Sequence, residues 1–280
     1  MITKAIIPVA GWGTRRLPNT KTIEKCMLPI GNLPLVDYVV QDCLKAGINE
    51  LIFIVSEGSS QLEDYYRSNI KLNDYLRQNQ KSDKLPLVAP LSGVKLHFIT
   101  QPSYGKYGTA VPVGLASDYI DEGESAVVLM GDDFIWNTDE SSEVARLIAG
   151  AEPGDCALLA AQVEPDETVN YGVIEPDQDG NYVRIVEKPA PEDAPSNLIN
   201  ISKYLLNKEL IDACREVPAS SRGEYELPDV INSHINAGGR IKVVPAEGLS
   251  EALQGIGHDV TGAGEWRCIP ARMPSMTPPR

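Results

Sequence analysis

KAIIPVAGWGTRRL, residues 4–17, joins an apolar strand to a glycine loop that carries two arginines. Residues 3–9 have the apolar run of a short buried strand. Gly11 and Gly13 permit a close backbone approach, so that successive N–H groups could surround a phosphate. Arg15 could add bidentate hydrogen bonds to the same phosphate. An ordinary tight turn explains the two glycines equally well. The spacing fits neither the dinucleotide pattern GxGxxG, because Arg16 replaces its third glycine, nor a P-loop.

Downstream, strands alternate with helices, which predicts an α/β fold with a mixed, mainly parallel central sheet. Helical spacing marks residues 33–47 and 110–120. Strand patterns mark residues 50–55, 94–100, 125–130, 156–163 and 181–187. Ligands of such sheets bind beyond the carboxyl ends of the strands. We therefore expect the site at three strand ends: where the first strand meets its glycine loop, at the turn after residues 50–55, and where residues 125–130 run into Gly131-Asp132-Asp133.

The composition narrows the class of protein. The 280 residues carry a net charge of −14, which argues against binding nucleic acid or an anionic membrane surface by bulk charge. The first 30 residues nevertheless sum to +4 and the remaining 250 to −18. The sequence predicts no signal peptide and no membrane span. Five scattered cysteines without a CxxC pair favour free thiols in a reducing cytoplasm, and no zinc site is expected.

Two short motifs at strand ends carry candidate chemistry. Asp132 and Asp133 could hold Mg²⁺, which prefers oxygen ligands and shares them with substrate phosphates. A solvated turn or a helix cap is the alternative for this pair. In Glu187-Lys188-Pro189 the carboxylate could accept from sugar hydroxyls while the ammonium meets a phosphate. A surface ion pair is the alternative there.

In combination, these motifs resemble a known family. KAIIPVAGWGTRRLPNTKTIEKCMLP, the segment Gln101–Gly105, VVLMGDD, YGVIEP, VEKPAPEDAPSNL and GEYELPDVI occur in order over residues 3–247. They resemble the sugar-phosphate nucleotidyltransferases, and within them the bacterial enzymes that use UTP and glucose 1-phosphate. The resemblance implies a Rossmann-like three-layer α/β/α fold. It also implies Mg²⁺ as cofactor, a homo-oligomer and a cytoplasmic location.

The resemblance implies a role for each matching position. Arg15, Lys25 and Asp132 would be catalytic, with Arg15 at the phosphates of the nucleotide, Lys25 at the reacting α-phosphate and Asp132 as the metal ligand. The nucleotide would be bound by Ala10, Gly11, Gly13, Thr14, Gln101 and Gly105. The sugar phosphate would be bound by Asp133, Gly172, Glu187, Lys188 and Glu224. An oxygen of the sugar phosphate would attack the α-phosphorus in line, and pyrophosphate would leave. Alignment and charge neutralisation would supply the catalysis.

The sequence departs from the family pattern in two places. Cys26 stands where the family has a glutamate that helps read uracil, and Trp12 and Arg16 are also unusual. Near the end, Gly255 takes the position of a second metal-binding aspartate, with His258 and Asp259 close by but out of register. The tail could be a natural divergence that uses Asp133, Asp259 or His258, it could mark a catalytically weak homologue, or it could follow a shifted reading frame.

We therefore expect residues 1–248 to form the nucleotidyltransferase domain. Its nucleotide half would be about 1–135 and its sugar half about 136–248, followed by a divergent tail at 249–280. The expected activity is Mg²⁺-dependent transfer of a uridylyl group from UTP to glucose 1-phosphate, giving UDP-glucose and pyrophosphate. The alternatives are a related enzyme that uses dTTP or another nucleoside triphosphate, and a sugar-nucleotide-binding regulator.

Overall fold

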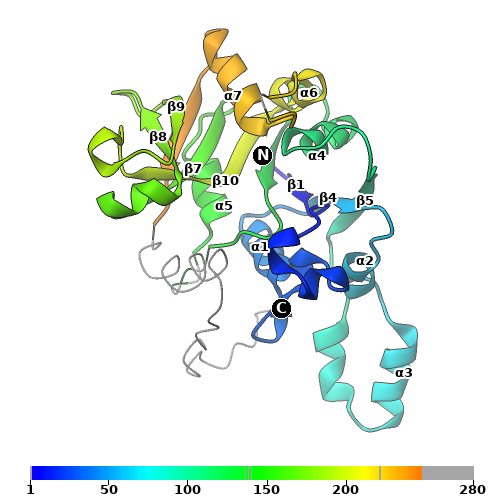
Figure 1. Ribbon diagram of the computed structural model, residues 1–280. Helices are drawn as coiled ribbons and strands as arrows, with labels where there is room; N and C mark the ends of the chain where they lie inside the picture. Colours follow the sequence, from blue (N-terminus) through cyan, green and yellow to red (C-terminus); the bar gives the residue numbers. More distant parts are fainter. Residues whose placement is uncertain (1, 136, 138, 140, 221, 248–280) are drawn as a thin grey trace.

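The computed structural model describes residues 2–247 except 136, 138, 140 and 221 (Figure 1). Within these residues a nine-stranded sheet has the central order β11-β7-β10-β6-β1-β4-β5, with β8 and β9 attached to one side through β10. The strands are β1 (Lys4–Pro8), β4 (Glu50–Ser56), β5 (Lys95–Gln101), β6 (Ser125–Leu129), β7 (Cys156–Gln162), β8 (Gly172–Pro176), β9 (Tyr182–Glu187), β10 (Leu198–Asn207) and β11 (Ile241–Pro245). A separate hairpin pairs β2 (Pro29–Ile30) with β3 (Leu33–Pro34).

The strand directions confirm the predicted mixed, mainly parallel sheet. β1 runs parallel to both β4 and β6, and β4 runs parallel to β5. β10 is antiparallel to its neighbours β6 and β7, while β11 is parallel to β7. The carboxyl ends of β1, β4, β5 and β6 therefore meet at one edge of the sheet, where an α/β protein binds its ligands.

Helices cover both faces of the sheet, which confirms the three-layer arrangement (Figure 1). They are α1 (Leu35–Lys45), α2 (Gln61–Tyr66), α3 (Ile70–Gln78), α4 (Ala110–Leu115), α5 (Glu143–Ala149), α6 (Lys208–Glu216) and α7 (Leu227–Asn236). Successive strand side chains point to opposite faces. Ala5 and Ile7 accordingly pack in one apolar cluster with α1, α2 and α5, whereas Ile6 packs in another with α4, α6 and α7.

The helix predicted over residues 110–120 is shorter in the structure. α4 ends at Leu115, and a 3-10 turn follows at Ser117–Tyr119. Ser117 is fully buried, and its hydroxyl donates to the Asp212 carboxylate of α6. A serine side chain that is engaged elsewhere does not favour a continuing helix, and Pro112 already weakens this one.

Two further properties concern the chain as a whole. Among the described residues, no helix is both long and apolar enough to cross a membrane. Cys26, Cys43, Cys156 and Cys214 are buried free thiols. Cys268 and the predicted divergent tail at 249–280 lie outside the described residues.

Gly131 sets the spacing between the first strand and the Gly-Asp-Asp turn. Its N–H donates to Pro8 O at 3.1 Å, and a Cβ built on it would overlap Val9 Cγ1 and lie 3.1 Å from Ile7 Cγ2. Gly131→Ala should therefore lower the free energy of unfolding by about 1–3 kcal/mol through overpacking, measured by urea denaturation. The double variant Gly131→Ala/Val9→Ala should recover part of that loss. If Gly131→Ala alone is as stable as the parent, this assignment of the spacing is wrong.

Candidate active site

The glycine loop after β1 is held by contacts with the segment that follows it. Gly13 has a φ of 61°, its carbonyl accepts from Thr20 Oγ1 and Arg16 N at 2.8 Å each, and an added Cβ would lie 2.9 Å from Thr20 Cγ2. A Cβ on Gly11 would instead meet no heavy atom within 4 Å. The loop is thus held at Gly13 by the segment that follows it, whereas there is open space beside Gly11. Arg15 lies exposed on the 3-10 turn Thr14–Arg16.

Lys25 and Asp132 form the central ion pair of this edge. Lys25 begins the 3-10 turn Lys25–Met27, Asp132 follows β6, and the ammonium contacts carboxylate oxygen Oδ2 although 107 residues separate the two. Both side chains are about one-third exposed, so a ligand can reach them. Burial lowers the pKa of Arg16, and the negative charge of Asp132 acts on that pKa in the opposite direction. Two cations therefore lie near one carboxylate.

A hollow beside the glycine loop contains several of the predicted nucleotide-binding residues. Ala10, Gln101 and Gly105 all line it, together with Ser56 at the end of β4. Gln101 ends β5 and is 91% buried. Gly11, Gly13 and Thr14 are not part of its lining. A Cβ on Gly13 would lie 3.1 Å from Lys25 Cβ, so this glycine lies against the Lys25 side of the loop.

Three aromatic side chains at the same hollow were not predicted as site residues. Trp12, Tyr104 and Tyr107 line it and are 66%, 82% and 53% exposed. Large exposed aromatic side chains that gather at one hollow mark a binding surface. The sequence signal was present, because Trp12 interrupts the glycine loop and the tyrosines flank Gly105, but exposure is not visible in a sequence.

Gly172, Glu187 and Lys188 come together at one end of the β8–β9 hairpin. Gly172 pairs with Glu187, and a Cβ on Gly172 would lie 3.1 Å from Glu187 Oε2. Lys188 has a φ of 47°, and its N–H donates to Tyr171 O at 2.9 Å. The glycine thus leaves room for the glutamate side chain. Within the described residues, no hydrogen bond or ion pair joins this group to Asp132.

The segment 223–227 packs against the loop that follows β5. Gly108 has a φ of 133°, and any side chain there would overlap the backbone of Tyr225. Tyr225 N donates to Tyr107 O at 2.8 Å, and Tyr225 O accepts from Ala110 N at 3.0 Å. These bonds place Glu224, which is predicted to bind the sugar phosphate, next to a residue that contacts Tyr107, and Tyr107 lines the hollow around Gln101. Glu226, two residues on, lines a second hollow instead.

Lys203 also was not predicted, and it contacts the Gly-Asp-Asp turn. It lies on β10, is 1% exposed, and its Nζ donates to Asp133 O at 3.1 Å and lies 3.9 Å from Asp133 Oδ1. A fully buried ammonium requires such partners. Lys203 thereby holds the Gly-Asp-Asp turn against β10. The lysine stands out in the apolar run of residues 198–206, which is the sequence signal that could have found it.

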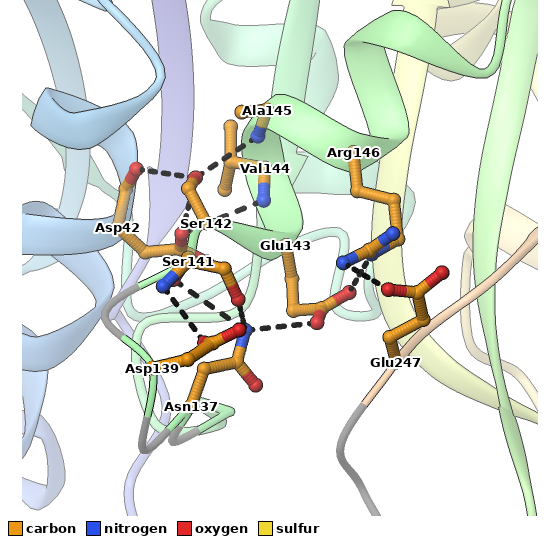
Figure 2. Close-up of polar contacts among 10 residues, drawn as sticks. All are labelled: Asp42, Asn137, Asp139, Ser141, Ser142, Glu143, Val144, Ala145, Arg146 and Glu247. Carbon is orange, nitrogen blue, oxygen red and sulfur yellow. Dashed lines mark hydrogen bonds and ion pairs between the residues drawn. The ribbon is translucent and has the colours of Figure 1, made fainter.

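The chain that leaves the Asp132 turn is anchored by polar contacts at the start of α5 (Figure 2). Ser142 Oγ accepts from Ala145 N at 3.0 Å and donates to Asp42 Oδ1 of α1 at 2.6 Å. Asn137 Nδ2 donates to Glu143 Oε1 at 2.9 Å, and Arg146 joins Glu143 to Glu247. Glu143 is 1% exposed, and burial raises its pKa. The segment after Asp133 is therefore tied to α1 and to the end of β11.

Cys26 does not line the hollow around Gln101. Its thiol is 2% exposed within the apolar cluster of α1 and α2, and burial raises its pKa to about 12. The neighbouring Glu24 accepts from Ser59 Oγ at 2.8 Å and Gln61 N at 3.2 Å at the start of α2. The position where the resemblance implies a base-reading glutamate therefore offers no polar group to a ligand.

The carboxylate of Asp132 suits a Mg²⁺ site in which a bound ligand would supply some of the other oxygen donors. Across the described part of the chain, no group of three or more histidine, cysteine, aspartate or glutamate side chains gathers as a metal cluster. Mg²⁺ commonly takes one or two carboxylates and completes its shell with water and substrate phosphates. A single accessible carboxylate beside an open glycine loop meets that requirement. Gly255, His258 and Asp259 lie outside the described residues.

Fold and site together define an α/β protein built to bind a phosphorylated nucleotide at the carboxyl edge of its sheet. Comparison with known proteins specifies the family. The model of the family described as nucleotidyl transferase matches residues 4–249, so this chain belongs to the nucleotidyl transferase family. The family-level resemblance inferred from the motifs is thereby confirmed.

Relatives and solved structures agree with this assignment. The UTP–glucose-1-phosphate uridylyltransferase of Streptococcus pneumoniae serotype 4 is 37% identical over 240 residues, which cover 83% of this chain and 79% of that protein. A structure of UTP-bound UGPase from Acinetobacter baumannii matches with a TM-score of 0.79 at 25% identity, covering 88% of this chain and 87% of that one. A UDP-glucose pyrophosphorylase complexed with UDP-glucose matches with a TM-score of 0.72 at 26% identity, covering 88% and 91%.

Proposed function

We propose that this chain transfers a uridylyl group from UTP to glucose 1-phosphate, giving UDP-glucose and pyrophosphate. The observation that carries the proposal is the Lys25–Asp132 pair. Lys25 packs against Gly13 of the glycine loop, and Ala10 and Trp12 of the same loop line the hollow around Gln101. A phosphate-binding loop, a cation and a metal-type carboxylate are the parts that phosphoryl-group chemistry uses. The names of the relatives support UTP and glucose 1-phosphate as the substrates.

In this proposal the residues divide into three sets. The triphosphate lies along Gly11, Gly13 and Thr14, with Arg15 at its outer phosphates. The base enters the hollow of Ala10, Gln101 and Gly105, so that residues 1–135 form the nucleotide half. The sugar phosphate is bound by Gly172, Glu187, Lys188 and Glu224 from the half at 136–248, and by Asp133 near the end of the nucleotide half.

The chemical step is an in-line displacement at the α-phosphorus. A phosphate oxygen of glucose 1-phosphate forms the new P–O bond as the bond to pyrophosphate breaks. Lys25 moves from Asp132 to the α-phosphate and neutralises the charge that develops there. Asp132 would hold Mg²⁺, which supplies further charge neutralisation when bound. No covalent enzyme intermediate is required, because alignment of the two substrates supplies most of the rate gain.

A nucleotide panel tests this function. Pyrophosphate release is measured with glucose 1-phosphate and Mg²⁺ for UTP, dTTP, ATP, CTP and GTP in turn. We expect the highest kcat/KM with UTP. The highest kcat/KM with dTTP or another nucleotide would show that the chain is a related nucleotidyltransferase with a different base specificity. The absence of pyrophosphate release with all five nucleotides would contradict the proposal. Size-exclusion chromatography with light scattering tests the proposed homo-oligomer in the same preparation.

Trp12 should contribute to nucleotide affinity through its contact with the base or ribose. Stacking of a base on an aromatic side chain contributes about 1–3 kcal/mol. Trp12→Ala should therefore raise the Kd of UTP at least about fivefold in isothermal titration, while the Kd of tripolyphosphate, which lacks a base, stays within about twofold. An equal rise in the Kd of UTP and of tripolyphosphate would show that Trp12 acts through the glycine loop instead.

A further inference from the structure

Lys203 is a buried cation on an inner strand of the sheet. β10 lies between β6 and β7, and Lys203 pairs with Leu129, the last residue of β6. Opposite residues of antiparallel strands project from the same face, so Lys203 lies on the face where Leu129 packs in the apolar cluster of α1 and α5. A buried ammonium loses its hydration, and an apolar side chain of similar volume often serves stability equally well. The lysine at this position therefore indicates a role other than stability.

The ammonium of Lys203 fixes the main chain on one side of Asp132. Its Nζ donates to Asp133 O at 3.1 Å and lies 3.9 Å from Asp133 Oδ1. On the other side, Gly131 N donates to Pro8 O at 3.1 Å, which ties the turn to β1. The direction of the Asp132 carboxylate is therefore set by bonds to β10 and β1, which hold the residues after and before it.

Lys203 also acts at the far end of the connection between β6 and α5. Burial raises the pKa of Asp42 on α1, and the positive charge of Lys203 opposes this shift. Asp42 Oδ1 in turn accepts from Ser142 Oγ at 2.6 Å at the start of α5 (Figure 2). One buried cation thus holds Asp133 and favours the charged form of Asp42, at the two ends of the chain that leaves Asp132.

We propose that Lys203 is a positioning residue for Asp132, because it holds the main chain of Asp133 and so fixes the direction of the carboxylate that would take Mg²⁺. The inference rests on the transfer reaction proposed above and names a further residue on which that reaction depends. Lys203 is not a catalytic residue, because its buried side chain acts through the turn. Groups that orient a metal ligand commonly change metal affinity or activity by about 10–100-fold.

Lys203→Met removes the charge and keeps an unbranched side chain of similar length. The Mg²⁺ concentration for half-maximal activity should rise at least about tenfold and kcat should fall about tenfold, with the KM for glucose 1-phosphate within about twofold. The midpoint of urea denaturation should stay unchanged or rise, because no buried ammonium remains. Lys203→Gln provides a second neutral side chain, and we expect the same changes in kcat and in the Mg²⁺ response.

A binding measurement gives a second readout that needs no turnover. The Kd of UTP is measured by isothermal titration, once with Mg²⁺ and once with a chelator. Mg²⁺ should lower the Kd of UTP for the parent, and for Lys203→Met this effect should be about tenfold smaller. The Kd of UTP with the chelator should agree within about twofold between the two proteins, because Asp132 then binds no metal.

Lys4→Met is the matched control. Lys4 begins β1 at the opposite edge of the sheet, its side chain is 12% exposed, and its ammonium donates to Tyr119 O at 2.9 Å and pairs with Glu124. It therefore holds a carbonyl and a carboxylate as Lys203 does, and its loss should leave both Mg²⁺ responses at parent values.

The outcomes separate the inference from the proposed function. Parent-like Mg²⁺ responses in both Lys203→Met and Lys203→Gln would overturn the inference, and so would an equal loss in Lys4→Met. Parent protein whose affinity for UTP does not change with Mg²⁺ also overturns it, even with turnover present. A parent that binds UTP more tightly with Mg²⁺ but transfers no uridylyl group contradicts the proposed function, and loss of that Mg²⁺ effect in Lys203→Met then still supports the role of Lys203.

Discussion

Lys25→Ala should lower kcat for UDP-glucose formation by about 10²–10³-fold, the loss expected when one preorganised charge is removed from a reacting phosphate. The physical reason is that the attacking phosphate and the α-phosphate both carry negative charge, and Lys25 is the cation that contacts Asp132 at this edge. KM for UTP should change much less than kcat, because the neutralisation is needed most in the transition state. Steady-state kinetics over a UTP series at fixed glucose 1-phosphate measures both.

The fold should tolerate this change. The Lys25–Asp132 pair is about one-third exposed, and exposed pairs contribute only about 0–1 kcal/mol to stability. Urea denaturation should therefore give nearly the parent midpoint. Lys84→Ala, which removes the same charge from the exposed stretch Ser82–Val88, is the control and should keep full activity. Residual kcat of Lys25→Ala within about threefold of the parent would show that Lys25 is not at the reacting phosphate.

Asp132→Asn should produce a loss of similar size and, in addition, a changed response to Mg²⁺. The amide keeps the shape of the carboxylate but carries no charge, so a metal ligand is weakened without loss of packing. We expect the Mg²⁺ concentration for half-maximal activity to rise at least about tenfold, with kcat at saturating Mg²⁺ still reduced. Initial rates over a Mg²⁺ series at fixed UTP give both values.

The control for this variant is Asp121→Asn, which neutralises a carboxylate with an 85% exposed side chain in a weak contact with Lys4. Its Mg²⁺ dependence should match that of the parent. The double variant Lys25→Ala/Asp132→Asn should lose less than the product of the two single losses, because residues that act as a unit are non-additive. An unchanged Mg²⁺ midpoint in Asp132→Asn would exclude Asp132 as the metal ligand.

Much of the site could be predicted because parallel strands bring distant residues to one edge. The glycine loop after β1, Gln101 at the end of β5 and Asp132 after β6 lie far apart in sequence, yet the strand order β6-β1-β4-β5 places them together. Each candidate followed a recognisable apolar run. Hydrophobic pattern and strand ends therefore placed the glycine loop and Asp132 at this edge, whereas the roles of Lys25 and Gln101 came from the family resemblance.

The residues that the sequence did not predict are positioned by structural features that leave no periodic pattern in the sequence. The register shift within β10, between Asn200 and Tyr204, leaves no mark on the alternation of residues 198–207. Lys203 could be noticed as a cation in an apolar strand, but its partner Asp133 is 70 residues away. The burial of Cys26 likewise depends on packing against α1 and α2, which the sequence does not specify.

Uridylyl transfer by this chain is tested most directly with UTP labelled at the α-phosphate. The labelled nucleotide is incubated with glucose 1-phosphate and Mg²⁺, and the products are separated by chromatography. We predict that the label appears in UDP-glucose, that pyrophosphate is released unlabelled in equal amount, and that omission of glucose 1-phosphate abolishes both. Binding of UDP-glucose without any transfer of label would contradict the enzymatic function and identify a sugar-nucleotide-binding regulator instead.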